Sequence, residues 1–118
     1  MKLISQFFQS VKHAIRGIYC LLSERHFRYH LAAAILVIGV GFYIGLSTME
    51  WCLVAIAISI VMITEGINTA IERCVDLASP EWHLLAKDAK DIAAGAVLIA
   101  SSCAAIIGFV IFLPKIVQ

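Results

Sequence analysis

Four side chains that carry oxygen atoms recur at helical spacing between residues 65 and 76. Glu65, Asn68, Glu72 and Asp76 are separated by three, four and four positions. Because each residue of an α-helix turns the chain by about 100°, a continuous helix places all four on one narrow stripe. Oxygen-rich clusters of this kind suit hard cations such as Mg²⁺, which takes one or two protein carboxylates together with phosphate oxygens.

This acidic stripe directly follows an apolar run, residues 51–64, that is typical of a membrane-spanning helix. Ionisable residues in such helices usually mark a functional site. The alternative is that these groups only hold neighbouring helices together by hydrogen bonding. Packing alone rarely needs three carboxylates on one stripe, which favours a site.

A second polar group, formed by Lys87, Asp88, Lys90 and Asp91, lies at the start of a later apolar run. Alone, such lysines would only anchor a helix at the membrane interface. Beside carboxylates that hold Mg²⁺, they would form a phosphate site, although the chain has no glycine-rich phosphate loop. The combination indicates phosphoryl transfer, in which positioning and charge neutralisation dominate catalysis.

Glu24 is a further candidate ligand, in the polar segment that precedes the first apolar run. Glu24 and Arg28 are one helical turn apart, so they could simply pair with each other. Together with the acidic stripe, however, Glu24 becomes a candidate metal ligand.

Composition places these groups in a membrane. The chain has 118 residues, of which 62% are hydrophobic and 14% charged, with a net charge of +1. These values predict an integral membrane protein of one domain, residues 1–118. Nearly balanced charge gives no electrostatic case for nucleic acid. The N-terminus lacks the apolar core of a cleaved signal and reads as mature sequence. The four scattered cysteines suggest packing rather than metal or redox chemistry.

We therefore expect an all-α membrane protein. Residues 4–22 carry apolar side chains at helical spacing, and Lys12 and Arg16 lie on the opposite flank. This pattern predicts an amphipathic helix at the membrane surface or against neighbouring protein. Three transmembrane helices are expected over 29–48, 51–78 (with a cytoplasmic extension) and 86–113. Small residues at fourfold spacing suggest close approach of further helices: Gly41 and Gly45, then Ala96, Ala100, Ala104 and Gly108.

Lysine and arginine indicate the orientation. They gather before the first span and around the connection between the second and third spans, and are absent from the first connection. The positive-inside rule then predicts a cytoplasmic N-terminus and an external C-terminus. Every polar cluster faces the compartment that holds ATP.

Over nearly its whole length the sequence resembles the small bacterial integral-membrane lipid kinases, which comprise diacylglycerol kinase and undecaprenol kinase. EGINTAIERCVD matches the family pattern E-x-x-N-[ST]-A-I-E-x-x-x-D, and AKDIAAGAV is the second specific match. The resemblance implies Mg²⁺-dependent transfer of phosphate from ATP to a lipid in the bacterial plasma membrane. It also implies a homotrimeric bundle with active sites shared between subunits.

The resemblance also implies residue roles. Glu65 would be the general base that orients the lipid hydroxyl, and Glu24 and Glu72 would bind Mg²⁺. Nucleotide or phosphate contacts would come from both polar groups, the connection between them and the N-terminal helix, namely Asn68, Asp76, Glu81, His83, Lys90, Asp91 and His13. Trp82, His13 and His26 depart from residues common in the family, which bears on nucleotide preference rather than on activity.

The acceptor lipid is open at this point. ERHFRYH resembles the E-R-N-F-R-x-H of the undecaprenol type more than the E-A-A-F-R-Q-E of the diacylglycerol type, which favours undecaprenol over diacylglycerol. The alternatives to a kinase are a small proton-coupled transporter that uses Glu65 and a structural subunit. A transporter needs access from both sides, whereas the outer half of this chain is uniformly apolar.

Overall fold

The computed structural model describes residues 1–118 as four α-helices: α1 (Lys2–Leu21), α2 (Arg25–Ile44), α3 (Thr48–Ala78) and α4 (Leu84–Ile116). Three of them, α2, α3 and α4, are long and apolar enough to cross a membrane. With 20 residues, α2 rises about 30 Å, the thickness of the hydrocarbon core. The prediction of an all-helical chain with three candidate membrane spans is confirmed.

The turns between these helices follow from local sequence. Gly45 ends α2 in the left-handed conformation, with φ of 81°, which glycine adopts without strain. Ser47 then begins α3 through a capping box, in which its hydroxyl accepts from the Glu50 amide and the Glu50 carboxylate accepts from the Ser47 amide. The side chain of His83 caps α4 by accepting a hydrogen bond from the amide of Leu85. The polar group at residues 87–91 therefore lies within α4.

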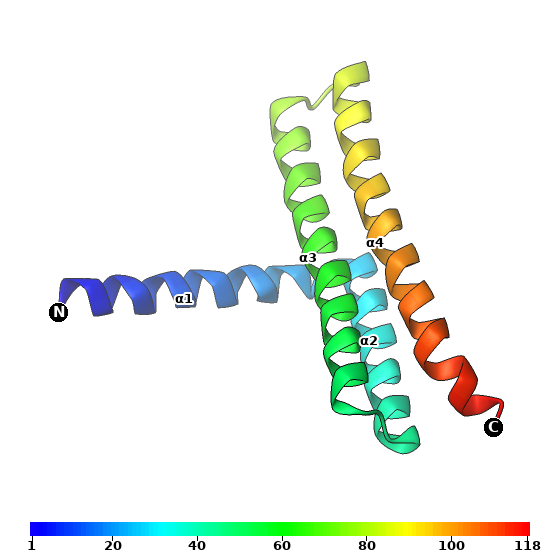
Figure 1. Cartoon of the computed structure of the whole chain (residues 1–118). Coiled ribbons are helices and arrows are strands. Elements are labelled where there is room, and N and C mark those ends of the chain that lie inside the picture. Colours follow the sequence, from blue (N-terminus) through cyan, green and yellow to red (C-terminus); the bar gives the residue numbers. More distant parts are fainter.

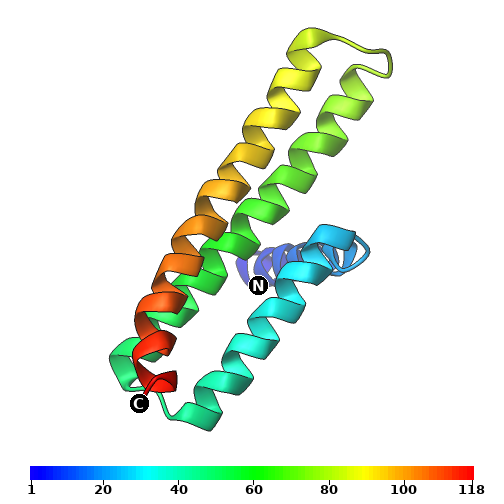
Figure 2. The same ribbon diagram turned by 90° about the vertical axis from the view of Figure 1, so that its right-hand side faces the viewer.

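The two longest helices form an antiparallel hairpin, and α2 packs along only part of it. Figure 1 shows α3 and α4 side by side toward the end of the hairpin that joins them, which rises well beyond the start of α2, whereas the C-terminal part of α4 diverges from α3. Figure 2 shows the same arrangement from the side, with α2 running beside the first part of α3 and joined to it by a short turn at the other end of the hairpin. The first half of α3 is thus level with α2, and its second half extends past it.

The chain buries little of itself. Only 12 of 118 residues are buried, and large apolar side chains such as Leu98, Ile99 and Phe109 on α4 are exposed. All four cysteines are free and exposed in the isolated chain. Exposed apolar area of this extent requires a lipid or protein environment.

The small residues divide into different roles. At Gly41 an added Cβ would lie 2.9 Å from the ring of Trp51, so Gly41 accommodates this indole. Gly45 has no neighbour within 4 Å and ends α2. On α4, Ala100 is buried, Ala96 is exposed, and Gly108 has open space above its Cα.

Helix α1 projects sideways from the other helices (Figure 1). Its residues are exposed as far as Cys20, and its apolar face includes Phe8, Ile15 and Ile18. Contact with the hairpin occurs at its end, where the side chain of Leu21 lies against Gly66 of α3. Nothing within this chain covers the apolar face of α1.

Candidate active site

Helix α3 is continuous through the acidic stripe, so its four polar residues lie along one side of the helix. Burial falls along the stripe: Glu65 and Asn68 are buried, Glu72 is half-buried and Asp76 is exposed. The stripe therefore runs from the region packed against α2 to the open end of the hairpin. An anionic ligand could reach a buried carboxylate along it only if cations accompany the ligand.

The middle of the stripe contains an oxygen atom without a partner. Asn68 Nδ2 donates a hydrogen bond to Glu72 Oε1 at 3.3 Å, which fixes the direction of the amide. The amide oxygen, Asn68 Oδ1, is buried and has no hydrogen-bond partner. Leaving such an atom unpaired costs about 1–3 kcal/mol, so this position suits a cation or a ligand donor.

One basic side chain, that of His30, approaches the carboxylate of Glu65. His30 Nε2 of α2 lies 3.6 Å from Glu65 Oε2. Sequence reasoning assigned no role to His30. A signal was available, because His30 is three residues after Phe27 and four before Ala34, and both of these are buried. Residues at this spacing share a helix face, so His30 faces the rest of the protein.

Glu24 contacts α3 rather than its own helix. Arg73 Nη2 donates to Glu24 Oε1 at 2.7 Å, whereas Arg28 Nη1 donates to the backbone carbonyls of Leu22 and Ser23, at 3.4 and 3.3 Å. The alternative pairing of Glu24 with Arg28 therefore does not form. Glu24 is the N-cap residue of α2, and its partner Arg73 directly follows Glu72 in the sequence. No three histidine, cysteine, aspartate or glutamate side chains converge as a metal cluster in this chain.

An open cavity of about 420 Å³ lies at the joined end of the hairpin, which we call the hairpin-tip cavity. Two ion pairs border it: Lys90 Nζ lies 2.5 Å from Asp76 Oδ1 of α3, and Lys87 Nζ lies 2.6 Å from Asp91 Oδ2. The cavity brings together five of the predicted nucleotide contacts, Asp76, Glu81, His83, Lys90 and Asp91.

The remaining predicted contacts lie elsewhere. Asn68 is lower on the stripe, and His13 is an exposed residue of α1, which projects away from the hairpin. Glu65 and Asp76 are eleven positions apart, a rise of about 16 Å along the helix. A ligand bound at the tip must therefore extend down the stripe to meet Glu65.

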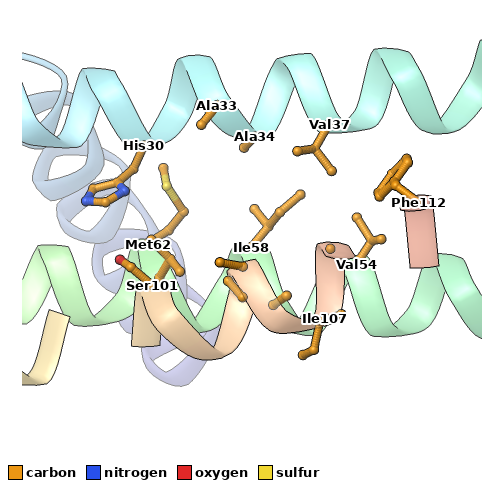
Figure 3. A pocket seen from close by; sticks show the side chains of 15 residues that line it. His30, Ala33, Ala34, Val37, Val54, Ile58, Met62, Ser101, Ile107 and Phe112 are labelled. Atoms are coloured by element: carbon orange, nitrogen blue, oxygen red, sulfur yellow. The ribbon is translucent and has the colours of Figure 1, made fainter. Parts of the chain in front are cut away.

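A second cavity, of about 280 Å³, lies between α2, α3 and α4 and is lined mainly by apolar side chains. Figure 3 shows His30 at one end of it, with Val37 and Phe112 toward the other end. Ser101 also lines this apolar cavity, and its buried hydroxyl has no partner. His30 therefore touches both the apolar cavity and the Glu65 carboxylate.

Comparison with known proteins assigns this arrangement to a family. Residues 12–112 match the family model for prokaryotic diacylglycerol kinase. The chain belongs to this family. The kinase is similar to the undecaprenol kinase of Bacillus subtilis (strain 168), with 46% identity over 114 residues that cover 96% of this chain and 93% of the relative.

Relatives of the other named activity are also similar to this kinase. The diacylglycerol kinase of Synechocystis sp. is 38% identical, over 92% of this chain and 63% of the relative. The diacylglycerol kinase of Escherichia coli (strain K12) is 34% identical, over 67% of this chain and 65% of the relative. The predicted resemblance is confirmed, and the protein is a membrane lipid kinase. The transporter and structural-subunit interpretations are thereby set aside.

Proposed function

We propose that this kinase phosphorylates undecaprenol to undecaprenyl phosphate with ATP. Support for the acceptor is the similarity to an undecaprenol kinase over 96% of the chain, together with the ERHFRYH segment that begins α2. Diacylglycerol is the second candidate acceptor, because relatives with that activity are 33–38% identical. The observation that carries the chemistry is Glu65, a buried carboxylate where the apolar part of α3 gives way to its polar stripe.

Glu65 is proposed as the general base. The lipid hydroxyl transfers its proton to a Glu65 oxygen while the hydroxyl oxygen forms a bond to the γ-phosphorus of ATP. The bond between that phosphorus and the bridging oxygen breaks, and ADP leaves with the bond's electron pair. His30 contacts only Oε2, so the second oxygen of Glu65 is free to accept the proton.

The residues present fit a single Mg²⁺ ion that is completed by phosphate oxygens. Glu72, which accepts from Asn68, and Glu24, which pairs with Arg73 of the same helix, would hold it, since Mg²⁺ needs few protein carboxylates. The unpartnered Asn68 Oδ1 is a further oxygen in this region. Mg²⁺ bound here would neutralise charge on the transferring phosphoryl group.

The nucleotide is proposed to occupy the hairpin-tip cavity, with its phosphates extending along the stripe. Lys90 would exchange the Asp76 carboxylate for a phosphate, and Lys87 would do the same from Asp91. Asp76, Glu81, His83 and Asp91 then face the nucleoside and its sugar hydroxyls, and Asn68 lies toward the γ-phosphate.

The functional unit is proposed to be a homotrimer with shared sites. The thin core and exposed apolar faces support association in the membrane. His13 would contact a nucleotide bound to a neighbouring subunit, because α1 extends away from its own hairpin. The distribution of lysine and arginine supports a cytoplasmic N-terminus and hairpin tip in the bacterial plasma membrane.

The test is phosphate transfer from labelled ATP by the purified kinase in lipid nanodiscs that contain either undecaprenol or diacylglycerol. We expect Mg²⁺-dependent labelling of undecaprenol with the higher kcat/KM. Faster labelling of diacylglycerol would assign that lipid as the acceptor. Absence of labelled lipid with both acceptors, in a correctly assembled protein, would contradict the proposed function itself.

A further inference from the structure

We propose that His30 is a positioning residue for Glu65, which it reaches from α2 across the interface with α3. In this inference, which rests on the proposed role of Glu65, the Nε2–H group of His30 holds one carboxylate oxygen so that the other faces the lipid hydroxyl. His30 itself does not accept the substrate proton. Its effect on turnover therefore passes entirely through Glu65.

The first observation is that Glu65 has no other side-chain partner. Its side chain is 6% exposed, and among all polar contacts of the chain only His30 Nε2 approaches it, at 3.6 Å from Oε2. A carboxylate withdrawn from water without a partner is costly. The separation is longer than a hydrogen bond, and contacts of this kind commonly shorten when substrate binds. Glu65 thus depends on His30 for its only fixed neighbour.

The second observation is the place of the imidazole ring. Phe27 and Ala34, on the same face of α2, are buried and fix that face against the hairpin. The ring of His30 is 26% exposed and closes one end of the apolar cavity (Figure 3). The ring therefore lies between the apolar cavity and the carboxylate. A side chain there determines which Glu65 oxygen faces that side.

The third observation is that only one ring nitrogen is engaged. Nδ1 of His30 makes no hydrogen bond in the chain, whereas Nε2 faces Glu65. The amide nitrogen of glutamine reaches about as far from the backbone as Nε2 of histidine, and that of asparagine reaches only about as far as Nδ1. Glutamine therefore keeps an N–H donor at the position of Nε2, whereas asparagine keeps a donor but moves it to the position of Nδ1.

The experiment compares four variants of the intact kinase in nanodiscs, using undecaprenol, diacylglycerol and Mg-ATP. His30→Gln is expected to keep kcat within about threefold of wild type. His30→Asn, His30→Ala and His30→Phe are expected to lower kcat by about tenfold to a hundredfold, the range that misplacement of a reacting group produces. The KM for ATP should not change, because the hairpin-tip cavity is remote from His30. Tyr43→Phe, at an exposed residue near the other end of the same helix, is the control and should behave as wild type.

A double-mutant cycle tests whether His30 acts through Glu65. In the Glu65→Gln background, His30→Asn should cause no further loss, since the group that His30 positions is already absent. Equal kcat for His30→Gln and His30→Asn would overturn the proposal, as would independent, multiplicative losses in the double variant. If the apolar or truncated variants assemble poorly, the Gln and Asn pair still decides the question. Turnover of wild type on at least one lipid is measured first, so failure of the proposed function is recognised separately.

Discussion

Lys90 of α4 contacts Asp76 of α3, with its ammonium nitrogen 2.5 Å from the carboxylate oxygen. The two residues are 14 positions apart in sequence and face each other across the joined end of the hairpin. Both side chains are substantially exposed, at 39% and 66%, so water weakens the pair. The ion pair therefore holds a lysine ready at the tip without binding it tightly, and a triphosphate can displace the carboxylate.

Removal of the Lys90 ammonium should weaken nucleotide use. We expect Lys90→Ala to lower kcat/KM for ATP by about tenfold or more, because a charge-assisted contact to phosphate is worth about 1.5–3 kcal/mol. Initial rates at varied ATP and saturating lipid provide the measurement. Lys115→Ala is the matched control. It removes a lysine of the last turn of α4 that pairs with Glu50 in the first turn of α3, at the end of the hairpin opposite to Lys90. Equal losses in both variants would point to general destabilisation.

Loss of the proposed base should stop turnover while nucleotide binding remains. Glu65→Gln keeps the size of the side chain but cannot accept a proton, so we expect kcat to fall by about a hundredfold or more. Binding of a fluorescent ATP analogue should remain near the wild-type level. A variant with near-normal kcat would remove Glu65 from the mechanism.

The metal assignment predicts a different response from the other two glutamates. Glu24→Gln and Glu72→Gln should raise the Mg²⁺ concentration needed for half-maximal rate, and excess Mg²⁺ should partly restore activity. Glu65→Gln should show no such recovery. The measurement is a Mg²⁺ titration at fixed free ATP, and superimposable curves for all variants and wild type would disprove the assignment. Because Glu24 also pairs with Arg73, Arg73→Gln controls for loss of that ion pair.

Shared sites predict recovery of activity in mixed oligomers. Subunits that carry Glu65→Gln and subunits that carry His13→Ala should each be impaired alone. After subunit exchange, some sites would combine an intact Glu65 of one chain with an intact His13 of its neighbour, and activity should rise above that of either variant alone. The readout is lipid phosphorylation after exchange, which two fluorescent labels verify. No rise in activity despite verified exchange would place each complete site within one subunit.

Periodicity alone predicted much of the architecture. Apolar runs specify membrane helices because the bilayer leaves the backbone few alternatives. The stripe was predictable for a related reason: one continuous helix fixes the relation between Glu65 and Asp76. The gathering of Glu81, His83 and Lys90 with Asp76 likewise follows from a short connection between two antiparallel helices.

Contacts between separate helices were harder to predict from the sequence. The pairing of Glu24 with Arg73 depends on how α2 docks against α3. Local spacing in the sequence instead suggested a pair between Glu24 and Arg28. His30 was overlooked because one histidine among several charged residues stands out only when its helical spacing from the apolar residues Phe27 and Ala34 is also considered. The role of Gly45 in ending α2 was not predicted, because glycines at fourfold spacing suit helix packing and helix termination alike, and its left-handed backbone is seen only in the structure.

Helix α3 is unbroken from residue 48 to residue 78, so it fixes the distances and directions between the residues along it. Its rise sets the separation between the proposed base and the nucleotide end, and its twist sets their common direction. One residue inserted between Glu72 and Asp76 would rotate the rest of α3 by about 100° relative to the part before it and turn Asp76 off the stripe. Changes of length are thus far more disruptive within this segment than in the connection at Ser79–His83, where irregular backbone can absorb them.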